Sequence, residues 1–370
     1  MAIKNIIFFQ GKTQYENTGD ILINKSLIQL LRKKGEVIIN DNGMPDWYVS
    51  SIVESKEECI SSKDVGFNRL LIKSALFEKG TKVFLIAGPP GHLFGNSANK
   101  SFRNILTAGY FSLLNLFGVK IIKIGFSIGP VGKSLAVTER IRAIFTHYYL
   151  VRDSISLKLS KSIGIAKADF FPDLAWMYQL KIGSSIQPKR KIVISFRNSI
   201  FEGQSDDTYL IKLRESLFAM LRNIDQTYSF EVVYQVKRDY DFCKKLYDEL
   251  KKEMNITFNE TQITLDNAAD AYAEAYCVIT NRLHGALLGY KYGALPVILT
   301  DANDHLKIKG IYQDAGVTEL LINIHDGINS NVSQFLSLLE NSNAIIGKMN
   351  VKEQEYIALS DNILAKILVN

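Results

Sequence analysis

The chain has 370 residues, of which 47% are hydrophobic and 22% are charged. This length exceeds what a single hydrophobic core usually supports, so it predicts two domains of ordinary globular composition. Lys and Arg total 44 against 38 Asp and Glu, which gives a formal charge of +6. This mild excess suits a small anionic substrate or an anionic membrane surface, and it does not indicate a nucleic-acid partner.

Cysteine usage and the longest apolar region exclude further classes. Cys59, Cys243 and Cys277 are far apart and odd in number. They predict neither a disulfide framework nor a cysteine metal site, and they favour the cytoplasm. The histidines and carboxylates show no metal-ligand spacing, so we expect no bound metal. The N-terminal apolar run is too short for a signal peptide, and charges and glycines interrupt region 108–128, which predicts a helix followed by a strand rather than a membrane span.

Short apolar runs alternate with longer amphipathic stretches, which is the pattern of βα units around a parallel sheet. In the first half we predict strands at 3–9, 37–39, 83–87, 119–126 and 148–151, and helices at 20–33, 68–77, 101–117 and 154–162. A stretch with Gly, Ser and Pro at 183–189 predicts a linker. Beyond it we predict strands at 191–196, 230–236, 277–280 and 296–299, and helices at 208–224, 241–252, 265–275, 283–292 and 353–368.

These elements predict an α/β protein with two doubly wound, Rossmann-like domains that face a cleft. We expect an N-terminal domain at 1–182 and a C-terminal domain at 183–345, followed at 346–370 by a helix that packs back across the junction. Ligand pockets favour domain junctions of this kind.

The most informative segment begins with the apolar run at 277–280 and continues through Asn281, Arg282, His284 and Gly285. It predicts a buried strand whose carboxyl end delivers a guanidinium and an imidazole to the edge of the sheet. In open α/β sheets, ligands bind beyond these strand ends and beside helix N-termini. A guanidinium can bind a carboxylate or a phosphate through two hydrogen bonds, and a histidine can move a proton near neutral pH. The segment therefore predicts a site for a small anionic substrate.

A polar segment at 11–20 follows the first strand and contains Asn17, Gly19 and Asp20. Gly and Asn tolerate tight turns, and the helix that follows offers free N–H groups to an anion. The pattern matches neither a dinucleotide fingerprint nor a P-loop. Asp20 is explained equally well as a helix cap.

Two further segments of the first half are open to more than one interpretation. The glycine- and proline-rich loop 88–95 contains His92 and fits either a ligand contact or a stiff turn. Arg152 follows the strand 148–151, where it could point into the crevice or pair with Asp153 or Asp173 at the domain surface.

In the second half, Arg197 stands at the end of the first strand, where it could complete a cationic cleft or be solvated. Lys307 lies one βα unit beyond Arg282, from where it could lean over the same pocket as a point charge. His305 is predicted to lie at the surface.

In this order the segments resemble the polysaccharide pyruvyl transferase family. The resemblance rests on six motifs: Asn17-x-Gly19-Asp20, Val151-Arg152-Asp153-x-x-Ser156, Pro172-Asp173, Thr280-Asn281-Arg282-Leu283-His284-Gly285, Gly293-x-x-Pro296-Val297-Ile298 and Lys307-x-x-Gly310. It implies a fold similar to GT-B glycosyltransferases and a reaction with phosphoenolpyruvate as co-substrate, without a further cofactor. The family forms a cyclic pyruvate ketal on two sugar hydroxyls and releases phosphate, during the assembly of capsules, exopolysaccharides and cell-wall polymers.

The resemblance also implies roles for the residues singled out above. Phosphoenolpyruvate carries a carboxylate and a phosphate, so it needs several cations, for which the candidates are Arg282, Arg152 and Lys307, with Arg197 in reserve. His284 is the candidate for a proton transfer, as acid, base or phosphate ligand, and Asp20 or Asp173 is the candidate for a second acid–base group. We expect Asn17, Gly19, Asn281, Gly285 and His92 to line the substrate site.

Two other function classes compete with this interpretation. A GT-B glycosyltransferase would place the diphosphate of a nucleotide sugar at the same crevice, but it needs in addition a base-stacking slot and an acidic ribose ligand. A non-catalytic scaffold ranks third, because function belongs to sites rather than folds. Under the favoured interpretation the partners are phosphoenolpyruvate and a sugar acceptor, free or lipid-linked, with peripheral contact at the inner face of the membrane as a further expectation.

Overall fold

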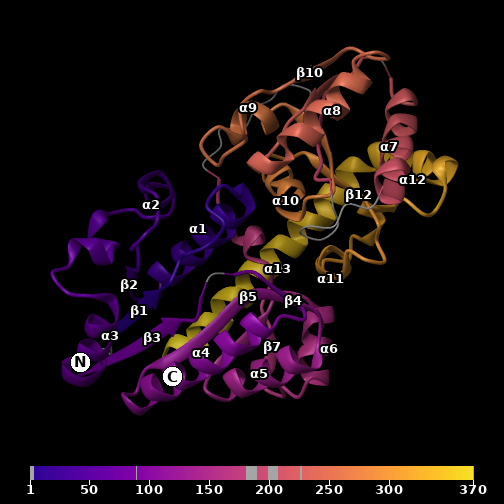
Figure 1. The fold of residues 1–370 in the computed structure, drawn as a ribbon. Coiled ribbons are helices and arrows are strands. Elements are labelled where there is room, and N and C mark those ends of the chain that lie inside the picture. The colour runs from indigo at the N-terminus through magenta and orange to yellow at the C-terminus, as the bar shows by residue number, and fades with distance from the viewer. Residues whose placement is uncertain (1–3, 89, 181–189, 199–206, 226, 370) are drawn as a thin grey trace. The chain divides into compact units, whose positions relative to one another are not determined.

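A computed structural model of the protein describes residues 4–88, 90–180, 190–198, 207–225 and 227–369 (Figure 1). The chain divides into two compact units. Unit 1 comprises Met1–Tyr15, Ile23–Met177 and Glu355–Asn370, and unit 2 comprises Glu16–Leu22 and Tyr178–Gln354. The predicted linker at 183–189 lies outside the described residues.

Unit 1 is built on a parallel sheet with the strand order β2-β1-β3-β5-β6-β7, and β4 pairs with β5 beside it. Its strands are β1 (Lys4–Phe9), β2 (Glu36–Ile39), β3 (Thr81–Ile86), β4 (His92–Gly95), β5 (Lys120–Val131), β6 (Tyr148–Val151) and β7 (Ala168–Phe170). Its helices are α1 (Thr18–Arg32), whose first residues up to Leu22 count with unit 2, and α2 (Asp46–Ile52), α3 (Phe67–Phe77), α4 (Ala98–Leu116), α5 (Lys133–Ile144) and α6 (Ser154–Ser162).

The strands of unit 1 are apolar on both faces because helices cover both. Phe8 and Leu85 point to the face where α3 and α4 pack, and they share a core cluster with Phe111 of α4. Ile7 and Phe9, which point to the other face, are also fully buried. Continuous apolar strands of this kind are typical of parallel sheets.

Unit 2 contains a second parallel sheet with the strand order β10-β9-β8-β11-β12-β13. Its strands are β8 (Lys191–Ser195), β9 (Ser229–Val232), β10 (Ile256–Phe258), β11 (Ala275–Thr280), β12 (Leu295–Thr300) and β13 (Leu321–Asn323). Its helices are α7 (Asp207–Arg222), α8 (Tyr240–Leu250), α9 (Ala268–Tyr272), α10 (Leu283–Lys291), α11 (Leu306–Asp314), α12 (Ile328–Glu340) and α13 (Ser342–Val369), the last of which ends in unit 1.

The strand order of unit 2 reverses between β8 and β11. From β8 the chain adds β9 and β10 on one side, and it then returns to add β11, β12 and β13 on the other. Such a reversal leaves a crevice outside the carboxyl ends of the two central strands, which is the preferred ligand site of open α/β sheets.

The predicted class of two parallel, doubly wound α/β sheets is confirmed. Region 108–128 is a helix followed by a strand, as predicted, because α4 ends at Leu116 and β5 begins at Lys120. Within the described ranges, no helix combines the length and the apolar character needed to cross a bilayer.

Several element boundaries differ from the sequence prediction. β5 continues to Val131 rather than ending at residue 126, because Gly125 adopts a positive φ of 73° at a bulge that lets the strand bend and go on. The loop around His92 contains the short strand β4, and α5 was not predicted at all. The predicted helix 265–275 is longer than the observed helix α9, which covers only Ala268–Tyr272, because β11 already begins at Ala275.

The units also divide the chain differently from the predicted domains. The segment Glu16–Leu22 groups with unit 2, whereas the sequence placed it in the N-terminal domain. The reason is tertiary: the Thr18 hydroxyl hydrogen-bonds the backbone carbonyls of Gln235 and Ile263, at 3.0 and 2.5 Å. Asn17 also forms a β-bridge with Val236.

Candidate functional site

Four charged or polar side chains follow the carboxyl ends of neighbouring strands in unit 2. Arg197 comes two residues after β8, Arg282 two residues after β11, and His305 five residues after β12. Asp239 follows β9 in a short 3₁₀ helix, Lys237–Asp239. Because all four strands are parallel, their carboxyl ends meet at one edge of the sheet, and Arg197 and Arg282 flank the reversal in strand order.

Arg282 is held at the start of α10. Its backbone N–H donates to the Thr280 hydroxyl at 2.9 Å. Its guanidinium forms an ion pair with Asp239, and the side chains are only 10% and 4% exposed. The Nε of Arg282 is buried and has no hydrogen-bond partner among the described residues. The geometry therefore fixes one end of the guanidinium while one N–H donor is left for another group.

Asn281 joins the two central strands where the strand order reverses. Its Oδ1 accepts from the backbone N–H of Arg197, and its Nδ2 donates to the Arg197 carbonyl, both at 2.9 Å. The same Nδ2 donates to the Tyr209 hydroxyl at 2.9 Å. The amide of Asn281 thus holds the backbone of Arg197 beside Arg282.

The side chain of Arg197 begins a series of buried polar contacts that runs through His305 to Thr300. Its Nη2 contacts Nε2 of His305, whose Nδ1 contacts the Thr300 hydroxyl. Because a guanidinium can only donate, Nε2 of His305 accepts and Nδ1 carries the proton. His305 is 2% exposed, so the prediction that it lies at the surface is wrong. Asp301 causes the burial: it caps the turn that follows β12 by accepting from two backbone N–H groups, and this turn folds His305 back against the strand.

Positive charge exceeds negative charge at this edge. Asp239 interacts electrostatically with Arg282, Arg238 and Arg197. Around Asp239, three guanidinium groups therefore surround one carboxylate. Burial raises the pKa of the Asp239 carboxyl, an effect that the arginines oppose. Burial and the nearby Arg282 lower the pKa of the Arg197 guanidinium to about 10. A preformed, partly buried cation pair of this kind is suited to a small anion with two charged groups.

The N-terminus of α1 packs against His284. A Cβ on Gly19 would lie 2.7 Å from Nδ1 of His284, so only glycine allows this approach without displacement. Asp20 lies in the first turn of α1 and accepts from Nδ2 of Asn17 at 3.1 Å. The structure therefore brings together the segments around Asn17 and around Arg282, which the sequence singled out separately.

Gly285 and Lys307 complete the set of predicted residues in unit 2. A Cβ on Gly285 would lie 2.5 Å from Oε1 of Gln235, so this glycine allows α10 to approach the strand-end loop after β9. Lys307 lies in the first turn of α11, two residues beyond His305, and is partly buried.

The remaining predicted residues belong to unit 1. Arg152 forms an ion pair with Asp173 at 3.1 Å, with side chains 3% and 0% exposed, and its Nε donates to the Ser127 hydroxyl at 2.7 Å. The sequence left two partners open for Arg152, namely Asp153 and Asp173. The ion pair forms with Asp173, and it is buried rather than at the surface. His92 lies on β4 and stacks on Phe94 with ring centroids 4.7 Å apart.

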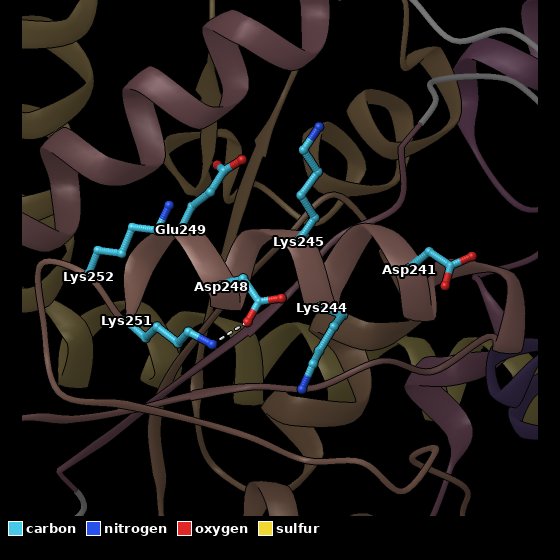
Figure 2. Close-up of a pocket in the computed structure, with 7 residues that line it drawn as sticks. All are labelled: Asp241, Lys244, Lys245, Asp248, Glu249, Lys251 and Lys252. Carbon is cyan, nitrogen blue, oxygen red and sulfur yellow. Dashed lines mark hydrogen bonds and ion pairs between the residues drawn. The ribbon is translucent and has the colours of Figure 1, made fainter.

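A surface hollow along α8 is lined by none of the residues described above. Figure 2 shows that its lining comes from α8 and the turn directly after it. The lining side chains are Asp241, Lys244, Lys245, Asp248, Glu249, Lys251 and Lys252. Both signs of charge alternate along it, and Lys251 pairs with Asp248. We interpret it as the solvated face of an amphipathic helix.

Comparison with known proteins decides the family. The family model for polysaccharide pyruvyl transferases matches residues 17–300. The chain belongs to the polysaccharide pyruvyl transferase family. The matched range begins at Asn17 and spans Arg197, Asp239, Arg282 and His284. As a member of this family, the protein is a pyruvyl transferase enzyme that acts in polysaccharide assembly. No curated protein sequence matches the chain.

Solved structures show that the fold is GT-B. A UDP-GlcNAc 2-epimerase from Neisseria meningitidis, bound to UDP-GlcNAc, is 13% identical with a TM-score of 0.56, over 99% of each chain. The epimerase from Methanocaldococcus jannaschii is 11% identical with a TM-score of 0.53, over 91% of this chain and 93% of its own. Trehalose 6-phosphate synthase from Burkholderia multivorans is 10% identical with a TM-score of 0.52, over 100% of this chain and 96% of its own.

Proposed function

We propose that this pyruvyl transferase uses phosphoenolpyruvate as the donor and forms a pyruvate ketal on two hydroxyls of a sugar. The acceptor sugar belongs to a polysaccharide or a lipid-linked glycan precursor. One hydroxyl oxygen bonds to the carbon that bears phosphate while the methylene carbon gains a proton. The second hydroxyl oxygen then bonds to the same carbon while the bond between that carbon and the phosphate oxygen breaks. Both hydroxyls give up their protons as they react.

The observation that carries this proposal is the cationic edge of unit 2. Arg197 and Arg282 flank the reversal in strand order, and Asp239 neutralises only one positive charge. A donor with both a carboxylate and a phosphate needs cations that are fixed before it arrives, because ordering long side chains during binding costs conformational entropy. Asp239 and Asn281 supply that order. Lys307 is proposed as a third, more mobile cation for the same donor.

His284 is proposed as the group that moves a proton during addition. It follows Arg282 by two residues and is positioned by Gly19 on one side. A positioned acid or base of this kind contributes roughly 10²–10⁴-fold in rate. Asp20 directly follows Gly19 in the sequence. It is proposed as a second proton carrier, for the acceptor hydroxyl. We propose that unit 1 binds the acceptor and that unit 2 binds the donor.

Calorimetric titration of the purified protein with phosphoenolpyruvate tests the donor site without knowledge of the acceptor. We expect binding by the wild type and binding weaker by about thirtyfold or more in Arg282→Lys, because the point charge of Lys cannot replace the guanidinium fork. Arg222→Lys is the matched control, since Arg222 lies on the surface of the same unit in an exposed ion pair with Glu253.

Nucleotide sugars serve as the competing ligand in the same titration. Tight binding of a nucleotide sugar with no binding of phosphoenolpyruvate would overturn the proposal in favour of a glycosyl donor. Where phosphoenolpyruvate binds, galactosides and mannosides can be screened for acceptor-dependent release of phosphate, which reports the transfer itself.

A further inference from the structure

The large apolar side chains that are exposed in this protein are concentrated on two helices. The described residues include fourteen exposed large apolar side chains, and seven of these belong to α4 and α5. They are Phe102, Ile105, Leu106, Leu113 and Leu116 on α4, and Val137 and Ile144 on α5. Scattered exposed apolar residues need no explanation, but a concentration of them marks an interaction surface.

On each helix these side chains form one stripe. Phe102, Ile105, Leu106, Leu113 and Leu116 recur at helical spacing along one side of α4. On α5 the exposed positions Lys133, Val137, Arg140 and Ile144 follow the same period and mix apolar with cationic residues. The buried residues of α4, including Phe111 and Leu114, occupy the opposite side and pack on the sheet. The exposed stripes are therefore additional to the faces that hold the fold together.

Two hydrogen bonds hold the two helices side by side. Asn104 of α4 donates to the carboxylate of Glu139 on α5 at 3.1 Å, and Asn115 donates to the carbonyl of Phe145 just beyond α5 at 3.0 Å. Glu139 is also bonded to Lys123 of β5 at 2.7 Å. These bonds anchor both helices to the same side of the sheet. We call the exposed stripes of α4 and α5, together with Lys100 and Arg103, the α4–α5 face.

The charge on the α4–α5 face has a single sign. Its charged residues are Lys100, Arg103, Lys133 and Arg140, all exposed, while the one carboxylate on either helix, Glu139, is fully buried. None of the four cations forms an ion pair with a described carboxylate. On α7 of unit 2, by contrast, Arg214 and Arg222 pair with Glu249 and Glu253.

We propose that the α4–α5 face docks the enzyme on an anionic membrane surface. Apolar side chains beside unpaired cations match the acyl–headgroup boundary of a bilayer, where the former insert and the latter contact lipid phosphates. Each cation near such a surface raises the partition coefficient about fivefold, and the effect is screened by salt. The contact is a peripheral one, made by side chains of α4 and α5.

Sedimentation of the full-length protein with vesicles tests the proposal. We expect the protein to sediment with vesicles of phosphatidylcholine and phosphatidylglycerol, and to remain in the supernatant with phosphatidylcholine alone or at high salt. Leu106→Ser combined with Leu113→Ser, and separately Arg103→Gln combined with Arg140→Gln, should each lower the bound fraction at least tenfold. Ile211→Ser and Arg222→Gln on α7 are matched controls, since both residues are exposed in unit 2.

Circular dichroism and thermal unfolding establish that each variant is folded before its binding is compared. Equal sedimentation of the α4–α5 variants and the α7 controls would overturn the proposal. It would also be overturned by a wild-type dimer in light scattering that becomes monomeric in the Leu106→Ser and Leu113→Ser variant, because a second copy would then cover the face. Neither result depends on the donor. The experiment therefore tests the docking surface independently of the proposed reaction.

Discussion

A methyl group on the α-carbon of Gly19 would lie 2.7 Å from Nδ1 of His284. Real Cβ atoms do not approach ring atoms this closely, so the imidazole would have to move. The first turn of α1 therefore sets the position of the side chain to which we assign the proton transfer. A segment near the start of the chain therefore lies against the Arg-x-His motif of residues 282–284.

Gly19→Ala is expected to lower kcat by about tenfold or more while phosphoenolpyruvate affinity changes little, because a displacement of about 1 Å at a reacting group can cost 10²-fold in rate. Steady-state kinetics, with calorimetry for the donor, separate the two quantities. Gly109→Ala is the control, since a Cβ there meets nothing within 4 Å, and it should leave kcat unchanged. An equal loss of donor affinity in Gly19→Ala would contradict the assignment.

His305→Ala is expected to weaken phosphoenolpyruvate binding and to lower the free energy of unfolding by about 1–3 kcal/mol. The substitution leaves a donor of Arg197 and the Thr300 hydroxyl without their buried partner. His305→Gln, which retains an acceptor, should recover part of both losses. Urea unfolding and calorimetry give the two quantities. Unchanged donor affinity in a destabilised His305→Ala protein would restrict His305 to a structural role.

The Arg152–Asp173 pair separates a structural role from a binding role. Arg152→Ala leaves Asp173 buried without its countercharge, and we expect a loss of about 3–5 kcal/mol in the free energy of unfolding. The double variant Arg152→Met with Asp173→Leu should regain part of it, because no unpaired charge remains buried, while the Ser127 hydroxyl and the Ala175 N–H each lose a partner. Thermal unfolding measures both. If the folded double variant no longer binds phosphoenolpyruvate, Arg152 belongs to the donor site.

Glu139 makes the stability of unit 1 depend on pH. Burial alone would raise the pKa of its carboxyl, but Lys123 and Arg142 outweigh burial and hold the pKa at about 2. A carboxyl with a depressed pKa stabilises the fold above its unfolded pKa, and this contribution is lost as the pH falls toward 2. Glu139→Gln should therefore be markedly less stable than the wild type at pH 7, and the difference should shrink between about pH 4.5 and pH 2. Urea midpoints across this range measure the difference, and a constant difference would contradict the prediction.

The sequence predicted the carboxyl ends of β1, β8, β11 and β12 to within one residue, because apolar runs bounded by polar residues mark them locally. Arg197, Arg282 and the segment around Asn17 were placed at carboxyl ends of strands before any contact was known, and the structure confirms those positions. It also predicted helix α1, since the polar turn at 11–20 precedes an amphipathic pattern.

The partners of these residues could not be predicted, because they depend on contacts between distant segments. Asp239 neutralises part of the charge on Arg282 from 43 residues away. A signal for Asp239 was present, since it follows an apolar run that was predicted as a strand, but nothing in its neighbourhood indicated a guanidinium partner. His305 was misplaced because its neighbours are polar, and only the capped turn at Asp301 buries it.

Unit 2 is discontinuous in the chain, and this has a consequence for dissecting the protein. A fragment that begins at Tyr178 would lack Glu16–Leu22, and the carbonyls of Gln235 and Ile263 would lose the hydroxyl that now satisfies them. The missing seven residues are short enough to synthesise as a peptide. Unit 2 is thus a natural candidate for fragment complementation, in which the added peptide restores the surroundings of His284 in trans.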